Sequence, residues 1–193
     1  MKTVVYSLLA VVLSALSASA AVVVVNVAGT GYFSVANGQL QPPELGNGHF
    51  VATFSYEDST VGSSDTYAGA LLSFSMTFSG GATFSATGGD IVSRNGDFHI
   101  QSVTGADFPT LAGKDFNGMV FKLFSSNGGV PLGQLPTAAE LNELYSPFFS
   151  WVIYGNNVNG FILTQSSFTA VPEPSCMLIA AGGLLGFVIR RRR

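Results

Sequence analysis

The stretch Leu72-Ser73-Phe74-Ser75-Met76-Thr77-Phe78-Ser79 alternates apolar and hydroxyl side chains at every position. Because successive side chains of a β-strand point to opposite faces, this period places the apolar groups on one face and the hydroxyls on the other. A helix, with its period of about 3.6 residues, would not sort them in this way. The stretch therefore predicts a half-buried strand in an antiparallel sheet.

The residues that follow predict two hairpins. Gly80-Gly81 is a turn signal, and residues 82–87 repeat the alternation of apolar and hydroxyl side chains. Asn95-Gly96 is a second turn signal, which joins residues 90–93 to residues 97–103. Paired glycines and Asn-Gly favour the tight turns that connect neighbouring antiparallel strands. Two consecutive hairpins are therefore expected in the middle of the chain.

Short strands dominate the rest of residues 21–175, which we call the body. Thr137-Ala138-Ala139-Glu140 is a capping box after Pro136, so one short helix is expected before Ser146-Pro147. Many short strands at this spacing predict an all-β fold, an antiparallel β-sandwich or jelly roll of about nine to ten strands with one short helix. The further strands are expected at residues 22–27, 31–36, 49–57, 118–125, 149–154 and 160–169, with a last hairpin loop at 156–160.

The composition of the body narrows its class. About 150 residues, 21–175, are the size of one domain. Cys176 is the only cysteine and lies beyond them, so the core must be held by apolar side chains rather than by disulfides. Arg94, Lys114 and Lys122 are the only basic residues there, against eleven acidic ones, which gives a formal charge of −8. This acidic balance excludes nucleic acid as an expected partner.

The N-terminus has the three parts of a secretory signal peptide. Lys2 supplies a positive start, residues 4–16 an apolar centre, and Ala18-Ser19-Ala20 a small-residue cleavage site. Residues 1–20 are therefore expected to be removed during export. An uncleaved anchor that continues through residues 22–25 is the alternative, but four valines suit the first strand of the body better.

The C-terminus carries a second set of signals. Residues 176–189 are mostly apolar and as a helix would reach about 21 Å, short of a hydrocarbon core of about 30 Å unless the flanking arginines snorkel. The excess of Lys and Arg in cytoplasmic segments would keep the arginines inside and the body outside. The apolar stretch is preceded by Val171, Pro172, Glu173, Pro174 and Ser175, and it is followed by Arg190, Arg191, Arg192 and Arg193.

This tail resembles the PEP-CTERM sorting signal of exported bacterial proteins, which joins a Pro-Glu-Pro motif, a transmembrane helix and a basic cluster. The resemblance implies an exosortase-type membrane protease as partner and a transient anchor in the inner membrane. It also implies delivery to the cell surface or the extracellular exopolysaccharide matrix. A plain tail anchor with an ordinary stop-transfer cluster is the alternative. Residues 1–20, 21–170 and 171–193 are then the signal peptide, the β domain and the sorting signal.

The body, from Phe50 to Asp97, also resembles domains found ahead of such tails, which mostly have no assigned activity. Its residues offer little catalytic chemistry. His49 and His99 are its only histidines, each in an expected strand where a solvent-facing position explains it. A Gly-x-Ser-x-Gly elbow and a zinc-ligand motif are absent. The chain is therefore expected not to be an enzyme.

Carboxylates are the remaining candidates for a bound ion. Glu57, Asp58 and Asp65 surround one expected loop and could supply oxygens to calcium, while Asp90 and Asp97 flank the Asn-Gly hairpin. Solvated loop acids are the ordinary explanation in an acidic exported protein. No other metal or cofactor is expected.

Two functions remain open for the body. The first is a noncatalytic surface or matrix protein, favoured by the paired export signals and by the shortage of catalytic groups. The second is a carbohydrate-binding module that retains exopolysaccharide through aromatic rings and carboxylates. The rings that could stack on sugars, unless they belong to the core or its rim, are those of Tyr56, Tyr67, Trp151 and Tyr154.

Overall fold

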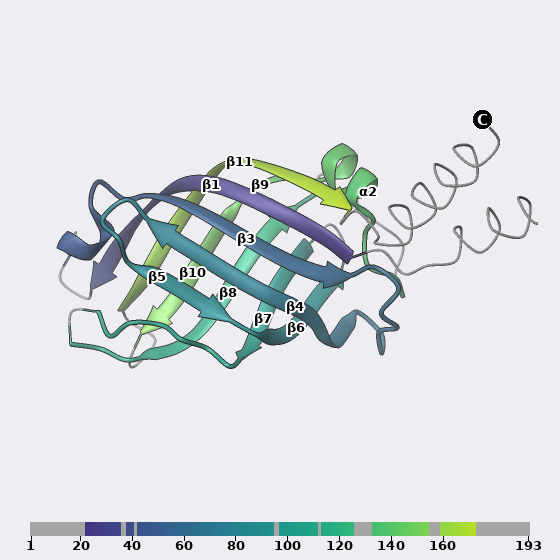
Figure 1. Ribbon diagram of the computed structural model, residues 1–193, viewed down its shortest axis with the longest axis horizontal. Coiled ribbons are helices and arrows are strands. Elements are labelled where there is room, and N and C mark those ends of the chain that lie inside the picture. The colour runs from purple at the N-terminus through teal and green to yellow at the C-terminus, as the bar shows by residue number, and fades with distance from the viewer. Residues whose placement is uncertain are drawn as a thin grey trace, which may run out of the picture. The chain divides into compact units, whose positions relative to one another are not determined.

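Long strands follow one another around a closed ring in the computed structural model (Figure 1). Each of the eight strands pairs antiparallel with the next, and β11 returns to pair with β1. The pairing of β10 with β8 completes the ring. The strands are β1 (Val22–Val35), β3 (His49–Glu57), β4 (Thr66–Phe78), β6 (Gly88–Arg94), β7 (Asp97–Thr104), β8 (Phe116–Phe124), β10 (Phe149–Tyr154) and β11 (Asn159–Pro172).

Shorter elements flank this ring. β2 (Gly38–Leu40) pairs with β1, β5 (Thr83–Ala86) with β4, and β9 (Ser146–Pro147) with β8. A 3-10 turn, η1 (Pro43–Leu45), precedes β3, and one helix, α2 (Ala138–Leu144), lies between β8 and β10 in the chain. The structure describes residues 22–35, 38–40, 42–94, 97–111, 113–125, 133–154 and 159–172.

The prediction of a sandwich or jelly roll is wrong, because the sheet closes into a barrel. A sandwich consists of two sheets, each with two edge strands, whereas every strand of this ring has a neighbour on both sides. The alternation that indicated strands is the same in both architectures, since each strand buries one face. Closure depends on the β1–β11 and β8–β10 pairings, which no local sequence pattern reveals.

Most of the individual elements were predicted correctly. β3 and β10 have the expected bounds, and the β4–β5 and β6–β7 hairpins pair in the expected order. In the expected capping box of α2, Thr137 Oγ1 accepts the N–H of Glu140 at 3.3 Å and Glu140 accepts the N–H of Thr137 at 2.8 Å. These elements depend on short-range patterns, which the sequence contains in full.

One expected break in the chain is absent. Strands were predicted at 22–27 and 31–36, but β1 runs unbroken from Val22 to Val35. Gly29 faces inward in the middle of β1, where an added Cβ would lie 2.4 Å from the carbonyl oxygen of Thr164 and 2.8 Å from the ring of Phe50. The glycine therefore allows β1 to pass close to its neighbours instead of ending the strand.

Aromatic side chains fill the barrel. The rings of Phe54, Phe98 and Phe121 come from β3, β7 and β8. The centroid of the Phe54 ring lies 6.1 Å from that of Phe98 and 6.0 Å from that of Phe121. An eight-stranded barrel is just wide enough for side chains to fill its interior. The largest fully buried side chains are Tyr56, Tyr67, Tyr154, Phe33, Phe54, Phe74, Phe78, Phe84, Phe98, Phe121 and Leu45.

The two terminal segments lie outside the described residues. The expected signal peptide, with Ala18 and Ala20, falls in residues 1–21, and the expected transmembrane sorting helix falls in residues 173–193. Within the described part of the chain, no helix has the length and apolar character needed to cross a membrane.

Candidate functional site

The first residues of the sorting segment belong to the barrel. Val171 and Pro172 are the last two residues of β11, where they pair with Val24 and Val23 of β1. Glu173, Pro174, Ser175 and the four arginines at positions 190–193 lie outside the described residues. The last described residue of β11, Pro172, thus comes immediately before the Glu-Pro part of the motif in the sequence.

The start and the end of the folded body are neighbours. Val22, the first described residue, opens β1, and Val23 pairs with Pro172 at the end of β11. A signal peptide cut after Ala20 would therefore leave a mature N-terminus beside the strand that leads into the sorting segment. The described residues nearest in sequence to the two expected cut sites, Val22 and Pro172, thus lie at one end of the barrel.

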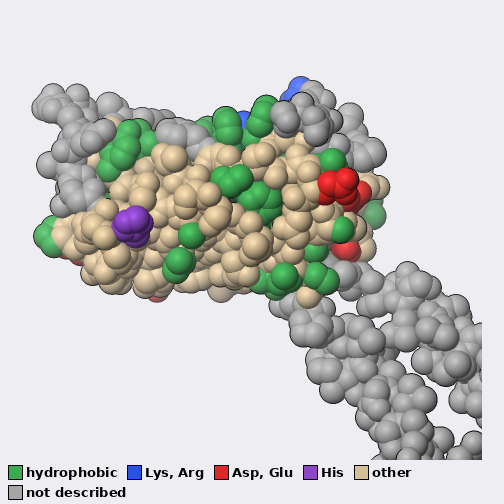
Figure 2. All heavy atoms as spheres, turned by 90° about the horizontal axis from the view of Figure 1, so that it is seen from above, with side chains coloured by type: hydrophobic (Ala, Val, Ile, Leu, Met, Phe, Trp, Pro, Cys, Tyr) green, Lys and Arg blue, Asp and Glu red, His purple; other side chains and the backbone are tan. Residues whose placement is uncertain are grey.

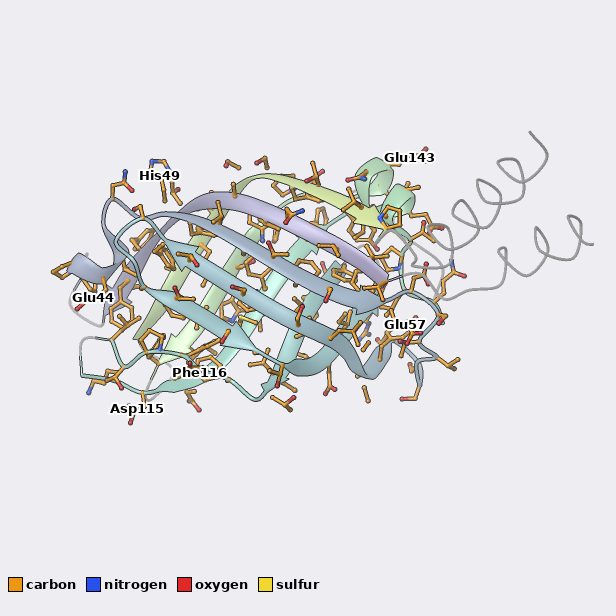
Figure 3. All side chains as sticks on the ribbon, viewed as in Figure 1. Glu44, His49, Glu57, Asp115, Phe116 and Glu143 are labelled. Atoms are coloured by element: carbon orange, nitrogen blue, oxygen red, sulfur yellow. The ribbon has the colours of Figure 1, made fainter. Side chains whose placement is uncertain are left out.

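The two histidines occupy different surfaces. His49 is exposed at the start of β3, and Figure 3 shows it at the opposite end of that strand from Glu57. His99 faces outward from β7 and is half-buried in an open pocket of about 490 Å³. That pocket also contains Asp65, Thr66, Val92, Arg94, Asp97 and Gln101.

Both carboxylates of the His99 pocket are paired with cations. Arg94 Nε lies 3.2 Å from Asp65 Oδ2, and Lys122 Nζ lies 2.9 Å from Asp97 Oδ2. Burial, followed by the charge of Lys122, lowers the pKa of His99, while Asp97 opposes this shift. The pocket is therefore an ion-paired patch on the outer wall.

Replacing His99 with asparagine should make the barrel less sensitive to acid. Because the folded-state pKa of His99 is lowered, the unfolded chain takes up a proton below about pH 6.5 while the folded chain resists it. The stability that His99 contributes is present above that pH and is lost as the pH falls through the folded-state value. Urea unfolding at about pH 7.5 and 5.5 measures the difference. His49→Asn is the matched control; equal acid losses in wild type and His99→Asn would contradict the prediction.

The proposed calcium ligands are not gathered around a common point. Asp65 instead pairs with Arg94, and Asp90 accepts the backbone N–H of Gly69 at 2.9 Å. Among the described residues, no group of three His, Cys, Asp or Glu side chains could hold a metal ion. Calcium binding by Glu57, Asp58 and Asp65 remains a prediction without support from this arrangement.

Three of the four rings suggested for sugar stacking are in the core. Tyr56, Tyr67 and Tyr154 are fully buried, and Trp151 alone is half-exposed. The hydroxyl of Tyr56 donates to the carbonyl oxygen of Pro136, and that of Tyr154 donates to the carbonyl oxygen of Pro109 at 3.1 Å. Burial raises the pKa of both phenols, so they remain neutral donors. These rings fix the barrel and are not available for stacking on a ligand.

An uncharged outer face is the feature that sequence reasoning missed. β1, β4, β5 and β11 contain no Asp, Glu, Lys or Arg, and β3 contains one, Glu57, at its end. Figure 2 shows this surface between a histidine near one end and acidic residues near the other. We call the following two cross-strand rows the hydroxyl wall: Thr169, Asn26, Thr53, Ser75 and Ser85, and beside them Ser167, Ala28, Val51, Thr77 and Thr83.

The hydroxyl wall combines hydrogen-bonding groups with small apolar ones. Thr53 Oγ1 donates to Asn26 Oδ1 at 2.9 Å, and just beyond the two rows the hydroxyls of Ser55 and Ser73 lie 2.7 Å apart. Val51, with 62% of its surface exposed, adds an apolar patch. The alternating hydroxyls of residues 73–79 predicted a polar face, but their alignment with β1, β5 and β11 required the register.

The tail matches the model of the PEP-CTERM protein-sorting motif over residues 170–193, which confirms the resemblance expected from the sequence. This motif is the C-terminal sorting signal of an exported protein, and it implies processing by exosortase, a membrane protein. No curated protein and no solved structure matches the chain.

Proposed function

We propose that the chain is a noncatalytic bacterial surface or extracellular-matrix protein, processed at its C-terminal signal after export. The observation that carries the proposal is the direct continuation of a closed, side-chain-filled barrel into the sorting motif at Pro172. Its interior is occupied by rings, and the carboxylates beside His99 are ion-paired. Both features favour a folded body that is displayed rather than one that turns over a substrate.

Mass spectrometry of the mature protein from its native host tests the processing step. We expect an N-terminus near Ala21 and a C-terminus near Pro174, in protein recovered from the cell surface or the medium. A matched chain in which Arg190 to Arg193 are all replaced by serine should lose sorting while its barrel still folds. A mature wild-type pool that retains Arg193 would contradict the proposal.

A host strain lacking the protein tests the noncatalytic role. The double variant His49→Asn and His99→Asn removes both imidazoles of the body while leaving the barrel interior unchanged. We expect it to restore the surface properties of the wild-type cells as fully as the unmodified chain does. A folded, correctly sorted double variant that fails to restore them would instead indicate catalysis.

The hydroxyl wall favours a second candidate, retention of a neutral exopolysaccharide. The ten residues of the wall carry no charge, although Asp107 is paired with Ser85 at the end of one row. On a body with a formal charge of −8, this wall suits a neutral polyhydroxyl chain better than a charged one. Its hydroxyls can both donate and accept hydrogen bonds, and Val51 provides apolar contact. On this candidate the wall, rather than stacked aromatic rings, would hold the sugar.

Co-sedimentation of the full-length chain with the host's neutral polysaccharide tests this candidate. Thr53→Glu places a charge in the middle of the hydroxyl wall. Gln101→Glu places the same charge in the His99 pocket on β7, outside the wall. We expect Thr53→Glu to abolish binding and Gln101→Glu to leave it intact. Equal binding by the two folded variants, or no binding by the wild type, would exclude the wall as a sugar site.

A further inference from the structure

The last part of β11 has a strand on only one side. β10 pairs with β11 from Tyr154 opposite Asn159 to Phe149 opposite Thr164 and goes no further. β1 continues to pair with β11 as far as Pro172. The edge of β11 that faces away from β1 therefore has no strand partner beyond this point within the described residues. The N–H of Gln165 still donates to the carbonyl oxygen of Phe148 at 3.3 Å, and α2 lies against β11. Where a strand edge has no neighbouring strand, its main-chain groups can bind other partners.

The side chain of Asn142 covers this edge at one residue. Asn142 Nδ2 donates to the carbonyl oxygen of Ala170 at 2.7 Å, and the N–H of Ala170 donates to Asn142 Oδ1 at 2.9 Å. Both main-chain groups of Ala170 thus bond away from β1, as alternate residues of an antiparallel strand do. One amide side chain takes the place of a neighbouring strand.

Helix α2 is fixed so that Asn142 can make this contact. The capping box between Thr137 and Glu140 closes its first turn, and Leu141 is fully buried in the core. Figure 1 shows α2 beside the end of β11. Because the helix is short, its position depends on this cap and on the buried leucine more than on its own propensity. The cap and the buried leucine therefore hold Asn142 beside β11.

The contact lies where the sorting segment begins. The matched motif starts at Ala170, so Ala170, Val171 and Pro172 belong both to β11 and to the matched sorting motif. Enzymes and domains that bind peptides commonly take an extended segment through its main-chain hydrogen bonds. The N–H of Ala170 cannot donate fully to Asn142 and to such an enzyme at the same time.

We propose that Asn142 is a positioning residue for processing, which holds the end of β11 in the barrel and so limits how much of the sorting segment is available to the protease. The inference rests on the proposed processing. It predicts that detachment of residues 170–172 precedes efficient cleavage. Loss of two hydrogen bonds of ordinary strength should raise the detached population roughly tenfold.

Asn142→Ala in the full-length chain tests the inference with two measurements. Hydrogen exchange of the Ala170 amide should be about tenfold faster, because its only bond in this direction is lost. Pulse-chase labelling in the native host should show several-fold faster removal of the tail. Asn142→Asp keeps an acceptor for the N–H of Ala170 but loses the donor to its carbonyl, so both of its rates should be intermediate.

Two control variants separate positioning from general destabilisation. Glu143→Ala alters the exposed neighbour of Asn142 on α2 (Figure 3) and should process as the wild type does. Ile100→Val loosens the core at β7 and should leave the rate unchanged despite its lower stability. If Asn142→Ala speeds exchange but all chains are processed equally fast, the inference is overturned while processing stands. If the wild type keeps Arg193, processing itself is refuted, and exchange at Ala170 still reports on the contact.

Discussion

Replacing Phe54 with alanine should lower the free energy of unfolding by about 3–5 kcal/mol, a large share of the roughly 5–15 kcal/mol typical of a domain. Phe54 is fully buried, and its ring contacts those of Tyr56, Phe98 and Phe121 at centroid distances of 6.4, 6.1 and 6.0 Å. These rings come from β3, β7 and β8, so Phe54 connects opposite walls of the barrel. Its loss would leave a cavity that no single neighbour can fill.

Urea unfolding of the full-length chain measures this loss from the shift of the transition midpoint. Val51→Ala is the matched control, because Val51 lies on the same strand and is 62% exposed. It should change stability by no more than about 0.5 kcal/mol. A loss below about 1 kcal/mol for Phe54→Ala would show that the walls are not held together by this ring.

Replacing Gln165 with leucine should cost roughly 2–5 kcal/mol, because it leaves buried polar groups without partners. Gln165 Nε2 donates to the carbonyl oxygen of Lys122 and to the hydroxyl of Ser150, both at 2.8 Å. Its Oε1 accepts the N–H of Phe148 at 3.1 Å. One buried side chain thus joins main-chain groups of β8 and of the residues before β10.

These bonds lie where the ladder between β8 and β10 ends. β8 and β10 pair from Val120 opposite Trp151 to Phe116 opposite Tyr154, and beyond Val120 side chains replace the ladder. There Ser150 accepts the N–H of Lys122 at 2.8 Å, while Gln165 takes the carbonyl of the same residue. Leucine has a similar volume but no polar atom, so the loss would come from unmade hydrogen bonds rather than from a cavity.

Thermal or urea unfolding of Gln165→Leu checks this result, and hydrogen exchange at Phe148 localises it. Ser166→Ala is the control: it removes a 3.1 Å hydrogen bond from an exposed hydroxyl to Ala28 and should cost less than about 1 kcal/mol. If Gln165→Leu were as stable as Ser166→Ala, the prediction would be contradicted, because the groups that bond to Gln165 in β8 and before β10 would have found other partners.

The sequence predicts the strands and the helix because their signals are local. The alternation of residues 72–79 and the capping box at Thr137 each lie within a few residues. The barrel could not be predicted in this way, because its closure pairs β1 with β11 from opposite ends of the chain. Sandwich and barrel impose the same inward-facing period on a strand, so the pattern alone favours neither.

The candidate sites also differ in whether their signals are local in the sequence. The sorting motif was predictable since its parts are contiguous, and its match to residues 170–193 confirms it. The contacts of Asn142 and Gln165 were not, because each residue bonds to main-chain groups at least 17 positions away. The hydroxyls of Tyr56 and Tyr154 also bond to distant partners, the carbonyls of Pro136 and Pro109. Side chains that act across the fold have no local pattern.

Val23 pairs with Pro172 because the ring has an even number of strands, and this decides which end of the barrel faces the surroundings. An even number of up-and-down strands returns the chain to the end at which it started, so the barrel has one end that holds both chain exits. A molecule tethered beyond Pro172 would expose the opposite end of the barrel to its surroundings. Figure 3 places Glu44 and Asp115 at that end. One strand more or fewer would put the two exits on opposite ends and reverse which loops the surroundings meet.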